Sequence, residues 1–379
     1  MRELVKFELS KIFQKKIIWI VAVLIAASIL IDSVNGINNI NRDFGNIEIL
    51  KTHLKNYEGE INPQKQLDVK NKISSIRDKL RNEEKITEEE SEFYYKSFEL
   101  RGYLNLKSNP KYLINDKEYT LSEMKSELDN GYEDSYEYRN LEKAYKAISV
   151  IEKPQYVYQH GWRRITQFGI AATMIVILLV LGISTIFSDE YKTNVIPIIL
   201  STPNGRKKLT GAKIISSMIY ASCVLIFISI LFFLSGLPYG LDGFNSLLNT
   251  NMSTARTPYG MTIIQFYFVC LGMSLLGALV LTLFIALVSL LTKNSMITLV
   301  LGVGMYFFAI SRFASILPKV VRLISVYELI QAKNIFAFYN SFNIFGRPVL
   351  YPTVIIIAAV IAIPTLISGI RYFGRRQSV

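Results

Sequence analysis

Histidine and cysteine are scarce in this chain of 379 residues. There are two histidines, His53 and His160, and two cysteines, Cys223 and Cys270. Zinc sites and intramembrane metalloproteases need such residues at short fixed spacings, for example H-E-x-x-H, and no such spacing occurs. A serine-type membrane protease would need a histidine base inside an apolar run. Both histidines lie in polar sequence, so we expect no metal site, no disulfide framework and no protease of these types.

Acidic side chains are missing from the interior of the long apolar runs. Asp32 stands only at the edge of the first run, so the paired carboxylates of a di-acidic membrane protease are not available. The spacing G-x-x-x-x-G-K-[ST], which cradles ATP phosphates, is also missing. We therefore expect a chain that is not an enzyme and that holds no cofactor of its own.

Charge is also rare within the apolar runs. Ion pumps and proton-coupled carriers usually keep ionisable groups at membrane depth, whereas Arg312 is the one charge within the fifth run. Arg312 either faces a cavity or a neighbouring subunit, or marks an early end of that run with its guanidinium reaching the interface. The transport of ions is therefore not favoured.

Apolar sequence is plentiful. The chain is 51% hydrophobic with a mean hydropathy of +0.30, and the apolar residues gather in runs that suit a hydrocarbon core about 30 Å thick, which takes roughly 20 helical residues to cross. We predict six transmembrane helices at 17–33, 165–187, 214–237, 261–291, 296–317 and 349–372. The predicted fold class is an all-α membrane protein.

The first residues predict a helix that lies along the membrane surface. In 1–16, Leu4, Phe7, Ile12 and Phe13 can share one face while five basic residues surround it, a pattern typical of interfacial helices near anionic headgroups. A signal peptide is the alternative, since charge precedes an apolar run. We favour an uncleaved span because the small residues suited to cleavage lie within the run.

Residues 34–162 are polar and carry a helical pattern. Apolar residues recur every three or four positions, as in Leu50 and Leu54 or Ile73 and Ile76. Two capping boxes, Thr87-x-x-Glu90 and Thr120-x-x-Glu123, are expected to begin helices. This segment is therefore predicted to form a separate helical domain.

The charge distribution predicts an orientation. The net charge is +12, but 34–162 holds 20 basic and 23 acidic residues, so the basic excess belongs to the membrane part and does not indicate nucleic-acid binding. With six spans, the short segments on the side of the two termini hold 14 Lys and Arg, against 5 on the other side. By the positive-inside rule both termini are cytoplasmic and 34–162 is extracytoplasmic.

The connector 188–213 has an unusual order of residues. Asp189 and Glu190 begin it, the apolar stretch 195–200 follows, and Ser201-Thr202-Pro203 leads to a basic group that starts at Arg206. The acids suit a helix N-terminus and Pro203 suits a helix end, so we expect a short helix along the cytoplasmic face. An ordinary interfacial loop helix would have a similar pattern.

This connector resembles the coupling region of type-2 ABC exporter permeases. The matching residues are an acid after the second span, a Ser-Thr-Pro and Arg pattern, and a lysine before the third span, here Glu190, Ser201–Pro203, Arg206 and Lys213. Segment 1–16 resembles the elbow helix of that family, and 318–348 its outer re-entrant region. A large extracytoplasmic domain between the first two spans is found in a subset linked to sodium extrusion, drug export and antimicrobial-peptide resistance.

The resemblance implies a permease in a bacterial plasma membrane. It would pair with a second copy or a sister permease and dock on cytoplasmic ABC ATPase subunits, which hold the ATP and Mg²⁺. The residues it implies for the contact are Asp189, Glu190, Thr202, Pro203 and Arg206. The apolar spans of this chain favour a hydrophobic or amphipathic substrate (a drug, a lipid or an antimicrobial peptide). The alternative is a sensory or resistance protein whose outer domain captures a peptide and signals without transport.

Overall fold

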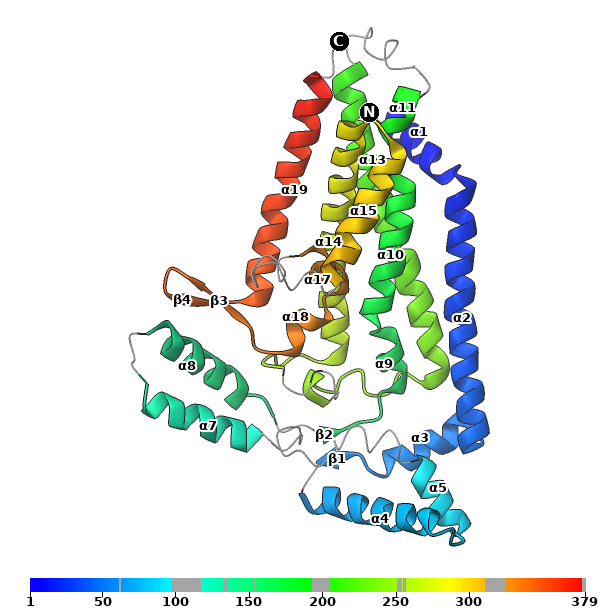
Figure 1. The fold of residues 1–379 in the computed structure, drawn as a ribbon, viewed down its shortest axis with the longest axis vertical. Helices are drawn as coiled ribbons and strands as arrows, with labels where there is room; N and C mark the ends of the chain where they lie inside the picture. Colours follow the sequence, from blue (N-terminus) through cyan, green and yellow to red (C-terminus); the bar gives the residue numbers. More distant parts are fainter. Residues whose placement is uncertain are drawn as a thin grey trace.

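A long helical bundle with smaller helices at one end forms the protein (Figure 1). The computed structural model describes residues 1–60, 63–96, 117–131, 135–152, 155–192, 205–250, 254, 257–310 and 325–376. The long helices are α2 (Lys16–Phe44), α10 (Phe168–Ile183), α13 (Gly205–Gly236), α14 (Ile263–Thr292), α15 (Ser295–Ile310) and α19 (Tyr351–Arg376).

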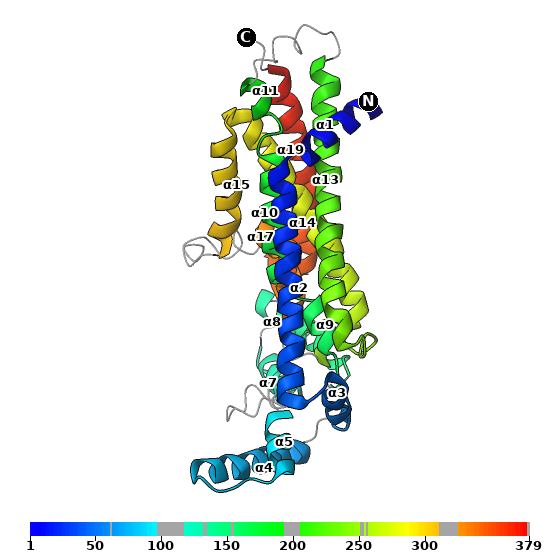
Figure 2. The same ribbon diagram turned by 90° about the vertical axis from the view of Figure 1, so that its right-hand side faces the viewer.

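One end of the bundle carries α1 (Arg2–Phe13), α11 (Ser188–Lys192), the start of α13 and the last turn of α19 (Figure 1). The helix α1 packs across α13, as Figure 2 shows. We call this the coupling end. The opposite end carries the following short elements: α3 (Ile47–Lys55), β1 (Gly59–Glu60), α4 (Pro63–Arg81), α5 (Glu88–Lys96), α7 (Lys117–Asp129), α8 (Tyr136–Ser149), β2 (Gln155–Tyr156), α9 (His160–Ile165), η3 (Leu237–Tyr239) and η4 (Leu248–Thr250). The helix α17 (Val326–Gln331) packs beside the middle of α14. It is followed by α18 (Lys333–Ala337), β3 (Ser341–Ile344) and β4 (Arg347–Leu350), which lead to the start of α19.

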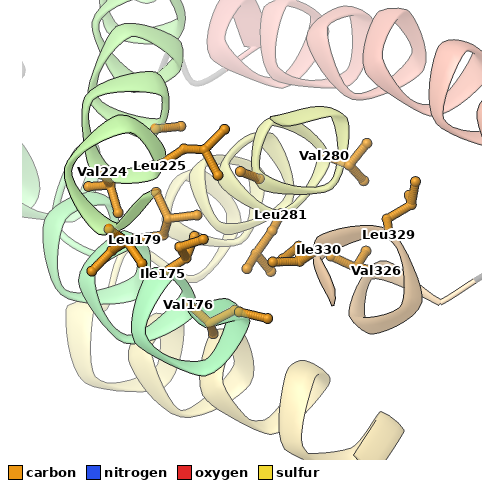
Figure 3. Close-up of a cluster of buried hydrophobic side chains, with 14 of the residues drawn as sticks. Ile175, Val176, Leu179, Val224, Leu225, Val280, Leu281, Val326, Leu329 and Ile330 are labelled. Atoms are coloured by element: carbon orange, nitrogen blue, oxygen red, sulfur yellow. The ribbon is translucent and has the colours of Figure 1, made fainter. Parts of the chain in front are cut away.

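The main core lies where α10, α13, α14 and α17 meet (Figure 3). Branched aliphatic side chains from all four helices interdigitate there, which is the packing that apolar helices need in order to bury one another. Those labelled in Figure 3 are Ile175, Val176, Leu179, Val224, Leu225, Val280, Leu281, Val326, Leu329 and Ile330.

Within the described residues, five helices are long and apolar enough to cross a membrane, and they correspond to five of the six predicted spans. The predicted fifth span, 296–317, coincides with α15, an apolar helix of 16 residues. Arg312 lies outside the described residues, so the six-span count stays a prediction. The outer helices of the bundle bury few of their residues: 28% of the most apolar stretch of α2 and 17% of that of α19 are buried, against 67% of the stretch around α10.

Two helices extend past the bounds of predicted segments. The helix α2 continues to Phe44, beyond the end predicted for the first span at 33, and Asp32 lies within it, where its carboxylate accepts a hydrogen bond from Arg164. The helix α13 begins at Gly205, within the connector predicted as 188–213. The ends of the membrane-spanning parts of these helices stay predictions.

The smaller core confirms part of the predicted helical pattern in 34–162. Leu50, Leu54, Ile73 and Ile76 are buried in it. The capping box at Thr87 is present: the backbone N–H of Glu90 donates to the Thr87 hydroxyl at 3.1 Å, and the Thr87 N–H donates to the Glu90 carboxylate at 3.0 Å. The prediction of a capping box at Thr120 is wrong, because α7 begins at Lys117 and Thr120 therefore lies inside the helix.

The strands are few and short, which agrees with the predicted all-α class. Among the described residues β1 pairs with β2 and β3 pairs with β4, both antiparallel. The β3–β4 hairpin and the helices α17 and α18 occupy the described part of the 318–348 segment. The re-entrant arrangement expected there remains a prediction.

Candidate functional site

The residues expected to contact an ATPase lie at the coupling end of the bundle. Asp189 and Glu190 are in α11, which follows α10 directly because the N–H of Asp189 still donates to the carbonyl of Thr185 at 3.1 Å. Thr202 and Pro203 lie outside the described residues. Arg206 is the second residue of α13, but its side chain is also outside the described part.

Glu190 belongs to a cluster of charges between three helices. Its carboxylate lies 2.8 Å from the ammonium of Lys213 on α13 and 4.0 Å from that of Lys11 on α1. The contact with Lys213 is an ion pair without the alignment of a hydrogen bond. The acid and the lysine that the family pattern singles out are therefore brought together in space.

Glu8 on α1 completes this cluster. Its side chain is 2% exposed, and its carboxylate lies 2.7 Å from Lys11 and 3.3 Å from Lys213. Two carboxylates thus face two ammonium groups. Since an unpaired charge in a low-dielectric site is very unfavourable, Glu8 and Lys213 depend on each other for their burial, and Glu190 and the partly exposed Lys11 add to the pairing.

Lys213 connects the cluster to the end of the second span. Its ammonium donates a hydrogen bond to the carbonyl of Ile186 and lies 5.1 Å from the centre of the Phe187 ring. Its side chain is only 2% exposed. One buried lysine therefore holds α1, α13 and the segment between α10 and α11 in one arrangement.

A cavity of about 300 Å³ opens beside the cluster. Lys15 and Asp189 line it together with Glu8, Lys11 and Glu190. The lining therefore carries both signs of charge.

Lys15 is bound to the end of the helix α10 and the turn that follows it. Its ammonium donates to the carbonyl of Gly182 at 2.8 Å and also to the hydroxyl of Thr185. Burial lowers the pKa of Lys15 to about 8; the nearby Asp189 carboxylate opposes this change, and Lys213 adds to it. The ammonium group of Lys15 therefore loses its proton at a pH closer to neutral than that of an ordinary lysine does.

Two residues of this site, Glu8 and Lys15, were missed at the level of sequence. Glu8 lies four residues after Leu4 and four before Ile12, so it falls on the apolar face of α1. An acid on such a face is a signal of a buried partner. Lys15 was counted only as one of the basic residues around the helix, and nothing in its spacing separates it from Lys16.

The cluster holds helices together and contains no arrangement typical of a reaction centre. No group of three or more metal-ligating side chains occurs in the part of the chain that the structure describes. Cys223 and Cys270 are both free thiols. Cys223 is exposed and Cys270 is buried.

Comparison with known proteins identifies the family. Residues 17–370 match the family model described as "ABC-2 family transporter protein". Searches of curated proteins and of solved structures found no match. The match covers nearly the whole chain, including five apolar helices that can cross a membrane. This family supplies the membrane part of ABC transporters and works with separate ABC ATPase subunits. The chain therefore belongs to the ABC-2 transporter family and is a multi-pass permease component of an ABC transporter.

Proposed function

We propose that this permease is an exporter whose connector 188–208 docks on a cytoplasmic ABC ATPase. ATP and Mg²⁺ are bound by that partner, and its cycle moves a hydrophobic or amphipathic substrate outward. The drugs, lipids and antimicrobial peptides suggested by the sequence remain the substrate classes to test. Two permeases, either two copies of this chain or one copy with a sister permease, form the pathway.

The single observation that carries this proposal is the buried cluster of Glu8, Glu190 and Lys213. The ion pairs join the start of the connector to both α1 and α13. A force applied to the connector by an ATPase therefore reaches the elbow helix and the third span at once. A docking segment can move the spans only if it is firmly joined to them, because a flexible connector would bend instead of passing the movement on.

The orientation follows from the charges and from the position of the helix ends. The elbow helix α1 and the last turn of α19 lie at the same end of the bundle (Figure 1). This end carries most of the basic residues of the short segments, so we place it in the cytoplasm of a bacterial cell. The small helices α3 to α8 are then extracytoplasmic, as in the subset with a large domain between its first two spans.

Charge reversal at Arg206 tests the proposal. A guanidinium can make two parallel contacts to a carboxylate of a partner, and a glutamate would repel that carboxylate. The permease is co-purified with its ABC ATPase partner and reconstituted in proteoliposomes with a panel of amphipathic compounds. We expect Arg206→Glu to abolish transport while ATP hydrolysis continues.

The matched control is Lys146→Glu, a charge reversal on the exposed surface of α8 at the other end of the molecule. This variant is expected to transport normally. Coupled transport at the normal rate in Arg206→Glu would contradict the docking role. If no ATPase co-purifies and no compound is moved, export itself is excluded.

A further inference from the structure

The hairpin of β3 and β4 stands immediately before α19. Ser341 pairs with Leu350 and Ile344 pairs with Arg347, and Tyr351 then begins the helix. In Figure 1 the hairpin projects sideways from this end of α19, and α8 lies on the side away from the bundle. Since α19 is a candidate span from Tyr351 onward, the hairpin lies at the boundary where a membrane begins.

One face of the hairpin is held by polar contacts to α8. The hydroxyl groups of Tyr136 and Ser341 lie 2.9 Å apart, and Ser341 also donates to the side-chain carbonyl of Asn140. Lys143 donates to the carbonyl of Pro348 at 2.9 Å. These hydrogen bonds mark the side of the hairpin that faces the hydrated helices.

The opposite face is apolar with one cation. Residues directly paired in an antiparallel ladder share a face, and successive pairs alternate between faces. Ser341 is on the α8 side, so Phe342 with Val349 and Ile344 with Arg347 are on the other. The ring of Phe342 lies 5.8 Å from that of Tyr351 at the start of α19.

The pair nearest the turn on this face, Ile344 and Arg347, is exposed. Ile344 is 38% exposed although it is apolar. The Arg347 side chain is exposed and makes no ion pair or hydrogen bond with any residue that the structure describes.

The tip of the hairpin is unusual for a turn in water. Phe345 and Gly346 form the two-residue turn with φ angles of 50° and 75°. Such a turn favours asparagine or aspartate before glycine, because other side chains are unfavourable at positive φ. The Phe345 side chain is also fully exposed. Neither the backbone nor an aqueous surface accounts for an aromatic ring here.

We propose that the β3–β4 hairpin is an interfacial anchor that inserts Phe345 and Ile344 into the headgroup boundary of the lipid bilayer. In this arrangement Arg347 lies at the depth of the lipid phosphates and binds them. The helix α19 that follows the hairpin also exposes apolar side chains, since Ile357 and Val360 are about half exposed. A bilayer covers that helix and the hairpin face together, with the polar contacts to α8 on the water side.

Site-directed spin labelling measures the depth of the tip. The background variant is Cys223→Ser with Cys270→Ala, which removes the native thiols, and Phe345→Cys carries the nitroxide in phospholipid nanodiscs. Collision with oxygen, which concentrates in lipid, is compared with collision with a water-soluble nickel chelate. Lys146→Cys on exposed α8 is the water control and Val360→Cys on α19 is the lipid control.

The anchor predicts an oxygen-to-nickel collision ratio at residue 345 several-fold above that of the water control and approaching that of the lipid control. A ratio equal to the water control overturns the proposal. A label shielded from both reagents also overturns it, because the tip would then be covered by protein, such as a second permease. These readouts do not depend on transport or on the substrate.

A second variant tests Phe345 itself. Asparagine suits the left-handed turn, so Phe345→Asn keeps the hairpin but removes the ring. A nitroxide is attached at Ile344→Cys, with and without Phe345→Asn. We expect the oxygen-to-nickel collision ratio of this label to be higher with Phe345 present than with Phe345→Asn. An unchanged depth in that variant would show that Phe345 does not anchor the hairpin.

Discussion

The carboxylate of Glu8 and the ammonium of Lys213 lie 3.3 Å apart, and each side chain is only 2% exposed. One is on the helix that precedes the first span, and the other begins the membrane part of α13. A buried pair of this kind restricts the relative motion of its two helices, because separating the charges leaves both without a partner. We therefore expect α1 and α13 to move together.

Removing the lysine of this pair should destabilise the permease. In Lys213→Ala the carboxylates of Glu8 and Glu190 face each other with only Lys11 between them. We expect a loss of about 3 kcal/mol, the size typical of a buried ion pair broken on one side. The unfolding temperature in detergent measures it. Lys207→Ala, an exposed lysine of the same helix, is the control and should change little; equal effects of the two variants would refute the role of burial.

The stability of the coupling end should rise with pH above about 8. Burial holds the pKa of Lys15 at about 8, below the 10.5 of an ordinary lysine. Between these values the unfolded chain binds more protons than the folded chain, so folding gains stability as pH increases. This gain is lost as pH falls through 8. Unfolding free energies of the parent and of Lys15→Gln, measured across this range, should differ in slope.

A substitution of the neighbouring Asp189 tests the same pKa shift of Lys15. The Asp189 carboxylate raises the pKa of Lys15 against the effect of burial. Asp189→Asn should therefore lower the pKa of Lys15 further, which the pH dependence of amine labelling followed by mass spectrometry can detect. An unchanged labelling profile would place Asp189 too far away to matter.

A pair of ion contacts joins α3 to the loop after α13. Asp242 lies 2.9 Å from Lys51 and 2.9 Å from Lys55. Desolvation favours a higher pKa for this carboxyl group, but the hydrogen bonds from Lys55 and Lys51 outweigh it and the pKa of Asp242 is lowered. Asp242→Asn should release α3, so hydrogen–deuterium exchange of 47–55 should become several-fold faster. Exchange at the parent rate would show that other contacts hold this helix.

The close approach of α9 to the loop after η3 requires glycine. A β-carbon at Gly161 would stand 2.0 Å from the carbonyl oxygen of Gly240, a backbone atom that cannot turn away. Gly161→Ala should destabilise the protein by about 3 kcal/mol or prevent its folding. Gly304→Ala is the matched control, because no atom lies within 4 Å of the added carbon. It should be neutral or slightly stabilising in its helix, and the yield and unfolding temperature of both variants compare them.

Part of the candidate site could be predicted from the sequence. Glu190 and Lys213 were identified by their order along the connector, and the structure brings them to 2.8 Å. Glu8 was not identified, because its significance depends on a partner far away in the chain. Thr202, Pro203 and Arg206 remain predictions, since the described residues do not include their side chains.

The helical membrane class and the positions of the apolar helices follow from the residues alone. Length, hydropathy and helical period are local properties, so a run of apolar residues indicates a span wherever it lies. The role of each charge, in contrast, depends on how the helices pack. Asp32 lies within α2 and pairs with Arg164, which is 132 residues further along the chain. Glu8 and Lys213 differ from other surface charges only because folding removes them from water together, and burial is a property of the packed chain.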